Sequence, residues 1–81
     1  MNDKNRMNTP TLIYTVKEVS NILHTSPAYI YDLIKAGLLP AIKLGSYKVR
    51  LESLENFLKK NEGNDLSNPY SVIKIQNPPT V

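Results

Sequence analysis

The sequence predicts a mostly α-helical single domain that carries one small β-hairpin. Two short amphipathic segments, at residues 15–23 and 26–36, are separated by a tight turn, and a third follows at residues 52–60. Between the second and third segments the apolar spacing changes from a helical period to alternation, which is typical of strands. With 81 residues and polar ends, the chain holds one domain at most. We expect a disordered arm at residues 1–11, the folded domain at 12–60 and a flexible tail at 61–81.

The composition excludes several classes of function. The chain has no cysteine, so disulfides, thiolate metal sites and thiol nucleophiles are excluded, and its one histidine, His24, cannot form a metal site alone. No apolar run has the length of a membrane span, so we expect a cytoplasmic protein without a membrane partner. The formal charge of +3 and the pI of about 9.3 are compatible with nucleic acid as a partner but do not establish one.

The first predicted helix begins at Thr15. Thr15 and Glu18 have the spacing of a capping box, in which each side chain satisfies a backbone donor near the other. Apolar residues recur at helical spacing and are predicted to face the core: Val16, Val19, Ile22 and Leu23. A short turn at His24 and Thr25 leads into the next helix, so the two segments make a helix-turn-helix unit.

The second predicted helix has a start signal and a stop signal. Ser26 is a good N-cap because its hydroxyl accepts a backbone hydrogen bond, and Pro27 suits the first helical position. Gly37 is expected to close the helix in the left-handed region. The inner stripe is Ile30, Leu33 and Ile34, and the outer side carries Ala28, Tyr29, Tyr31, Asp32 and Lys35. This helix therefore buries one side and offers polar and aromatic groups to water on the other.

Residues 41–51 are predicted to form the β-hairpin. Gly45 and Ser46 lie between two runs of alternating residues, and glycine supplies the positive φ of a hairpin turn. The alternation predicts apolar residues beneath the hairpin, namely Ile42, Leu44, Val49 and Leu51. It predicts three cations above the hairpin, namely Lys43, Lys48 and Arg50.

Helical spacing resumes at residues 52–60, where acidic residues near the start and lysines at the end complement the helix dipole. The predicted core residues of this helix are Leu54, Phe57 and Leu58. Residues 61–69 are polar and turn-forming. Residues 70–75, which read YSVIKI, are an apolar patch of β character. Three outcomes stay open for this patch: disorder, an added strand on the hairpin, or contact with a partner.

The order of helix, turn, capped helix, hairpin and helix resembles the winged helix-turn-helix domain of the excisionase and MerR-like DNA-binding family. The resemblance runs from about Ile13 to Leu58. It is carried by YTVKEVSNIL at 14–23, by Ser26, and by IYDLIKAGLLPAIKLG at 30–45. It implies a double-stranded DNA partner, with the second helix in the major groove and the hairpin beside it as the wing.

The resemblance also implies candidate DNA contacts. Ala28 is expected to pack on a thymine methyl group, and the hydroxyls of Tyr29 and Tyr31 to reach phosphates or bases. Asp32 either accepts from a cytosine amino group or is a surface charge that pairs with Lys35 or a hairpin cation. Lys35 and the hairpin cations are expected to contact phosphates. The full expected set is Ser26, Pro27, Ala28, Tyr29, Tyr31, Asp32, Lys35, Lys43, Ser46, Tyr47, Lys48 and Arg50.

Two biological roles follow from the resemblance: an excisionase of a phage or mobile element, or a small transcription regulator. An integrase or neighbouring copies of the chain are the further partners expected. A protein-interaction adaptor with the same fold, as in a terminase small subunit or a partition adaptor, is the alternative. No heptad pattern follows Lys60, which counts against that adaptor and against a coiled-coil dimer. An enzyme fits worst, because no phosphate loop or metal-ligand cluster is present, and we expect no cofactor and no small-molecule substrate.

Overall fold

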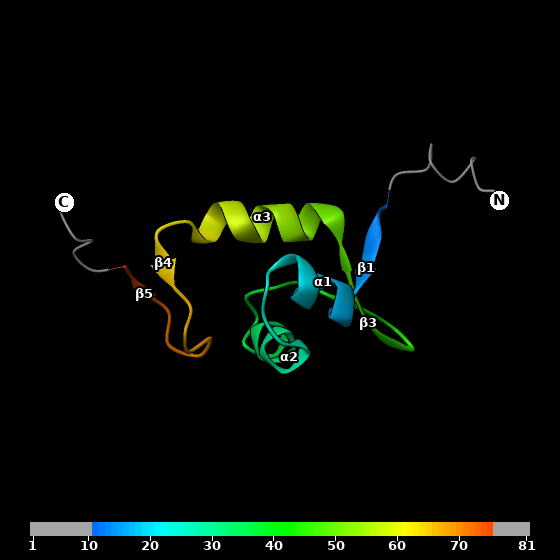
Figure 1. The fold of residues 1–81 in the computed structure, drawn as a ribbon, viewed down its shortest axis with the longest axis horizontal. Helices are drawn as coiled ribbons and strands as arrows, with labels where there is room; N and C mark the ends of the chain where they lie inside the picture. Colours follow the sequence, from blue (N-terminus) through cyan, green and yellow to red (C-terminus); the bar gives the residue numbers. More distant parts are fainter. Residues whose placement is uncertain (1–10, 76–81) are drawn as a thin grey trace.

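The computed structural model describes residues 11–75 of the chain. Its elements are β1 (Ile13–Thr15), α1 (Val16–Ile22), α2 (Pro27–Lys35), β2 (Ile42–Leu44), β3 (Ser46–Arg50), α3 (Leu51–Asn61), β4 (Asn64–Asp65) and β5 (Ile73–Lys74). Figure 1 shows α3 along one side of the molecule and α2 on the other side, with the wing at one end and β5 at the opposite end. This order confirms the winged helix-turn-helix fold. The arm expected at residues 1–11 lies, apart from Thr11, outside the described residues, as do residues 76–81.

The start and end of α1 are fixed by local hydrogen bonds. The Thr15 hydroxyl accepts from the backbone N–H of Glu18 at 3.0 Å, and the Glu18 carboxylate accepts from the backbone N–H of Thr15 at 2.8 Å. This is the predicted capping box. At the other end, His24 has a φ of 57°, and the N–H of Thr25 donates to the oxygen of Ser20 at 2.8 Å. A histidine thus occupies a left-handed position that glycine usually takes.

The ends of α2 also agree with the cap residues predicted from the sequence. The Ser26 hydroxyl accepts from the backbone N–H of Tyr29 at 3.2 Å. Gly37 follows the helix with a φ of 81°, and the N–H of Leu38 donates to the oxygen of Leu33 at 3.0 Å. This pattern stops the helix and turns the chain toward the wing.

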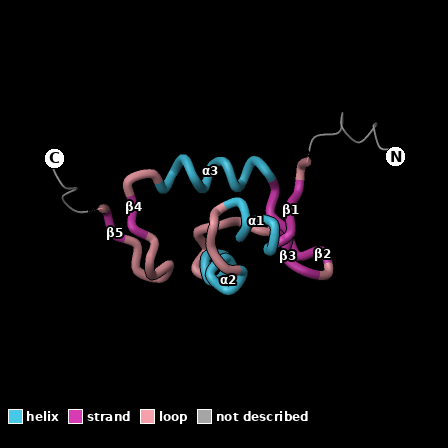
Figure 2. Tube along the Cα trace, in the orientation of Figure 1, coloured by secondary structure: helices cyan, strands magenta, loops and turns pink. Residues whose placement is uncertain are grey.

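β1, β3 and β2 form an antiparallel sheet with β3 in the centre (Figure 2). The sequence predicted the β2–β3 hairpin, but it did not predict that residues 13–15 pair along the other edge of β3. The hairpin turns at Gly45, which has a φ of 82°, and this turn places Lys43 opposite Tyr47.

The faces of the hairpin differ from the sequence prediction. Residues directly opposite each other in an antiparallel pair share a face, so Lys43 lies on the face of Tyr47 and Val49. Val49 is fully buried, which makes this the core side of the sheet. The opposite face carries Ile13, Ile42, Leu44, Ser46, Lys48 and Arg50. The predicted burial of Ile42 and Leu44 is therefore wrong, and their side chains are 40% and 57% exposed.

The hydrophobic core lies between the helices and the inner face of the three-stranded sheet. Its buried members are Val16, Val19, Ile30, Leu33, Leu39, Val49, Leu54 and Phe57. The predicted packing of Phe57 is confirmed. Ile22 and Leu58 were also predicted to face the core, but each is 44% exposed. A domain of this size buries only a narrow stripe of each helix, and these two residues lie beyond it.

After α3 the chain folds back onto the domain. β4 and β5 pair into a separate antiparallel sheet, while Leu66 packs against the core and Pro69 is buried. Within residues 70–75, Ile73 and Lys74 form a strand, but it pairs with β4. The strand expected on the hairpin is therefore wrong, and contact with a partner stays a prediction. The structure therefore differs from the flexible tail expected over residues 61–75, because Leu66 and Pro69 supply apolar anchors.

Candidate nucleic-acid interface

Three exposed side chains form a stripe along the outer face of α2. Ala28, Tyr31 and Lys35 follow one another at spacings of three and four residues, so they project from the same side of the helix. Ser26 and Pro27 are exposed at its N-terminal end. This side of the helix therefore offers small, aromatic and basic groups to a partner.

The wing is joined to this stripe by aromatic contacts. The rings of Tyr31 and Tyr47 meet edge to face, with centroids 6.1 Å apart and an interplanar angle of 61°. The Nζ atom of Lys43 lies 4.5 Å from the centroid of the Tyr47 ring, close enough for a cation–π interaction. Lys43 is therefore held on the side of the hairpin that adjoins α2. Figure 1 shows that α2 and the hairpin tip both lie away from α3.

Tyr29 does not belong to the exposed stripe, contrary to the sequence prediction. Its side chain is half-buried against the core, and its hydroxyl donates to the backbone oxygen of Leu66. Burial, together with the nearby charge of Asp65, raises the pKa of Tyr29 above its usual value. The hydroxyl of Tyr29 thus makes an intramolecular hydrogen bond that links α2 to the segment following α3.

Leu66 is the residue that the sequence analysis missed. It is the one leucine in the polar stretch NEGNDLSNP at 61–69, and it packs beside Tyr29 against the core. An isolated apolar residue among turn-forming residues is the signal that would have indicated an anchor point. Its contact with Tyr29 was not predicted, because Tyr29 was expected to face water.

Asp32 is half-buried at the border of the α2 stripe. One expectation paired it with Lys35 or with a hairpin cation. Among residues 11–75 no such pair forms, and the ion pair that does form joins Arg50 and Glu52 at 3.1 Å. The carboxylate of Asp32 is therefore not neutralised by either of these expected partners.

Three of the expected DNA contacts lie on the hairpin face that points away from Tyr47. They are Ser46, Lys48 and Arg50. The ammonium group of Lys48 donates to the Ser46 hydroxyl at 2.8 Å, and Arg50 is paired with Glu52. The structure thus brings Lys43 and Tyr47 to the α2 stripe and separates these three residues from it.

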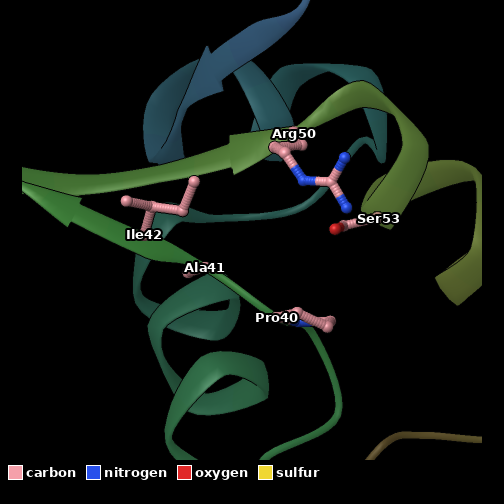
Figure 3. A pocket seen from close by; sticks show the side chains of 5 residues that line it. All are labelled: Pro40, Ala41, Ile42, Arg50 and Ser53. Atoms are coloured by element: carbon pink, nitrogen blue, oxygen red, sulfur yellow. The ribbon is translucent and has the colours of Figure 1, made fainter.

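A shallow hollow of about 130 Å³ lies beside Arg50 (Figure 3). Pro40, Ala41, Ile42 and Ser53 line the rest of it. Its walls carry no acid and base pair, and within the described part of the chain no three His, Asp or Glu side chains gather as a metal site. The exposed surface of α2 and the wing is therefore the strongest candidate for function.

Comparison with known proteins agrees with this geometry. The helix-turn-helix domain family matches residues 13–62, which is well over half of the chain. The chain belongs to this family. The match confirms the excisionase-like family expected from the sequence, and it supports DNA binding by the helix-turn-helix domain. In such domains the second helix of the pair enters the major groove, and here that helix is α2.

The chain is also similar to the uncharacterized protein YvgK of Bacillus subtilis (strain 168). The two are 42% identical over 48 residues, which are 58% of this chain and 16% of YvgK. The chain thus spans a small part of that relative's length. No solved structure matches the chain significantly. In the described region, no helix combines the length and apolarity needed to traverse a bilayer.

Proposed function

We propose that the domain binds double-stranded DNA sequence-specifically, with α2 in the major groove and the β2–β3 wing alongside. The observation that carries the proposal is the contact of Tyr31 with Tyr47, under Lys43, which makes the α2 stripe and one side of the wing a continuous surface. A major groove admits an α-helix, and residues near the helix N-terminus reach base edges. In this arrangement Ala28 packs on a thymine methyl group and the Tyr31 hydroxyl reaches a base or a phosphate.

The remaining base contact that we propose is made by Asp32. A carboxylate in the major groove accepts a hydrogen bond from the amino group of cytosine. The same charge repels phosphates, so Asp32 favours sites that carry cytosine at the facing position and disfavours the others. Ser26 and Pro27, which are exposed at the helix start, lie nearest the backbone of the duplex.

Lys35 and Lys43 are the proposed phosphate contacts. Both are exposed and both lie on the side shared by α2 and the wing. Each neutralised phosphate contributes about −0.9 to the slope of log K against log salt, so two contacts predict a slope of about −2. Four contacts were expected from the sequence, but Lys48 and Arg50 lie on the opposite face of the hairpin.

Selection from a random duplex pool tests the proposal. The selected site and a scrambled duplex of equal composition would be titrated by fluorescence anisotropy at several salt concentrations. We expect a consensus whose individual mismatches cost about 1–3 kcal/mol each. A pool that yields no consensus, or equal affinity for both duplexes, contradicts sequence-specific binding.

The biological role that we propose is excision control or transcription control, with no catalytic activity of the domain itself. Membership of the excisionase-like helix-turn-helix family supports both roles, since both use the same DNA surface. If the protein binds the attachment site of a mobile element and increases excision by the integrase of that element, it is an excisionase. Binding to a promoter with altered transcription and unchanged excision identifies a regulator. Capture of a protein partner without affinity for either DNA supports the adaptor alternative.

A further inference from the structure

The segment that contains the last described strand, β5, leaves apolar side chains in water. Tyr70, Val72, Ile73 and Ile75 are between 37% and 61% exposed, and they fall within six consecutive residues. Figure 1 places β5 at the end of the molecule opposite the wing and on the outer side of β4. An exposed apolar cluster away from the DNA surface indicates a separate interaction site.

Within residues 11–75, the backbone of β5 has one paired edge and one unpaired edge. The N–H of Ile75 donates to the oxygen of Gly63 at 2.9 Å, on the β4 side. Backbone groups alternate in direction along an antiparallel strand, so those of Ile73 and Ile75 point toward β4, and those of Val72 and Lys74 point away from it. Among the described residues no strand pairs with this outer edge. Unpaired donors and acceptors of this kind are a template for another strand.

We propose that the outer edge of β5 pairs antiparallel with the β5 edge of a second copy of the chain, about a two-fold axis at Ile73. The outward groups of Val72 in one copy then exchange hydrogen bonds with those of Lys74 in the second copy. Ile73 meets its own counterpart in a non-hydrogen-bonded pair, where the Cα atoms lie about 4.5 Å apart. The two small sheets join into one continuous sheet, and the exposed isoleucines cover each other.

Charge selects this register. A register centred on Lys74 places the two lysines directly opposite each other, and like charges in that position are destabilising. A register centred on Val72 leaves the outward groups of Lys74 without a β5 partner. With the axis at Ile73, each Lys74 lies opposite a Val72 of the second copy. The contact is also self-complementary, so assembly closes at two copies.

The proposed contact between the two β5 edges involves few residues, so it buries little surface and is weak by itself. An interface well below about 1,000 Å² is weak and transient in free solution. Two copies held on neighbouring DNA sites have a high effective concentration, which favours the pair. Because the axis is two-fold, the two sites are inverted repeats. The arrangement of sites rests on the proposed DNA binding, whereas the pairing of β5 edges does not.

A cysteine placed on the proposed axis tests the pairing without DNA. The chain has no cysteine, so Ile73→Cys carries a single thiol, and the expected Cα separation suits a disulfide. Leu44→Cys, at the exposed tip of the wing, is the matched control, with a similarly exposed position. In a glutathione redox buffer, at equal protein concentrations, we expect several-fold more disulfide dimer from Ile73→Cys. Equal amounts from the two variants overturn the proposal, whatever the protein does with DNA.

A second pair of variants tests the backbone hydrogen bonds. In the Ile73→Cys chain, Lys74→Pro removes an N–H that points away from β4, so it blocks the outer edge without removing a β4 hydrogen bond. Lys74→Ala removes the charge and keeps the N–H. We expect the proline variant to fall to the level of the Leu44→Cys control and the alanine variant to retain the dimer. Unchanged crosslinking in the proline variant overturns the pairing.

Discussion

Tyr31 on α2 and Tyr47 on β3 meet edge to face, with their ring centroids 6.1 Å apart. An aromatic pair of this kind contributes about 0.5–1.5 kcal/mol beyond the area it buries. Since Lys43 lies over the same Tyr47 ring, the contact fixes both the wing and its lysine relative to α2. In the proposed complex, the position of the wing on DNA depends on this pair of rings.

Tyr47→Leu should weaken DNA binding, because it keeps an apolar side chain but removes the ring that holds Tyr31 and Lys43. Loss of the aromatic contact predicts a fall in affinity of between about twofold and about tenfold. Tyr70→Leu is the control, since Tyr70 is an exposed tyrosine in the segment between β4 and β5, outside α2 and the wing. Fluorescence anisotropy with a labelled duplex measures both variants. Equal affinities for the two would show that the ring contact does not position the wing.

Lys43→Ala should lower DNA affinity and make it less sensitive to salt, because one proposed phosphate contact is lost. The slope of log K against log salt is expected to become shallower by about 0.9. Lys48→Ala is the matched control, as it removes the same charge from the opposite face of the same hairpin. It should leave the slope close to that of the wild type. The assignment of faces fails if Lys48→Ala has the larger effect.

Tyr29→Phe should destabilise the domain and leave DNA affinity unchanged. The substitution removes the hydroxyl that donates to Leu66 and leaves a half-buried backbone acceptor without that donor. A hydrogen bond of this kind is worth about 1 kcal/mol of unfolding free energy. Urea unfolding measures the loss, and anisotropy measures binding. An unchanged stability together with weaker binding would return Tyr29 to the DNA surface, where the sequence analysis placed it.

The same tyrosine predicts a pH dependence of stability. Burial and the charge of Asp65 raise the folded-state pKa of Tyr29 above its usual value of 10.0, so the folded protein binds this proton more tightly than the unfolded chain. The corresponding stabilisation is fully present below pH 10 and is lost as the pH rises through the folded-state pKa. The difference in unfolding free energy between the wild type and Tyr29→Phe should therefore shrink above pH 10. A difference that stays constant or grows there would contradict the prediction.

His24→Gly should stabilise the domain. The left-handed conformation costs a non-glycine residue about 1–2 kcal/mol, while glycine adds about 0.5–1 kcal/mol of unfolded-state entropy. We therefore expect a net gain of between about 0 and about 1.5 kcal/mol in the free energy of unfolding, measured by thermal or urea unfolding. Thr25→Gly is the control: it lies next to His24 but has no positive φ, so it should destabilise. A loss of stability in His24→Gly would mean that the imidazole makes a contribution beyond the backbone turn.

The helix ends could be predicted from the sequence, because they depend on residues close together in the chain. Ser26 and Gly37 act through their own backbone neighbours, so the ends of α2 can be predicted from residue type and spacing. Thr15 and Glu18 fix the start of α1 in the same way. The family resemblance and these caps together predicted the winged helix-turn-helix fold.

The faces of the hairpin could not be predicted because they depend on register. A two-residue turn at Gly45 and Ser46 would pair Lys43 with Lys48 and place both on one face. The observed turn at Gly45 pairs Lys43 with Tyr47 instead. A shift of one residue in a hairpin exchanges every side chain between the faces, and Val49 in the core decides which register holds.

The burial of Tyr29 depends on a contact between distant parts of the chain. Its partner Leu66 lies 37 residues away, within a stretch whose composition indicates only turns. Helical periodicity places Tyr29 at the edge of the apolar stripe, and that position suits water and core equally well. Tyr29 is half-buried because the segment that follows α3 folds back and brings Leu66 against it.

The most direct test of the proposed DNA surface is an NMR titration of the ¹⁵N-labelled protein with its selected duplex. We predict that the amide signals of Ala28, Tyr31, Lys35 and Lys43 shift, while those of Lys59 and Lys60 at the end of α3 stay in place. Shifts concentrated on α3, with the signals of α2 and the wing unmoved, would contradict the account.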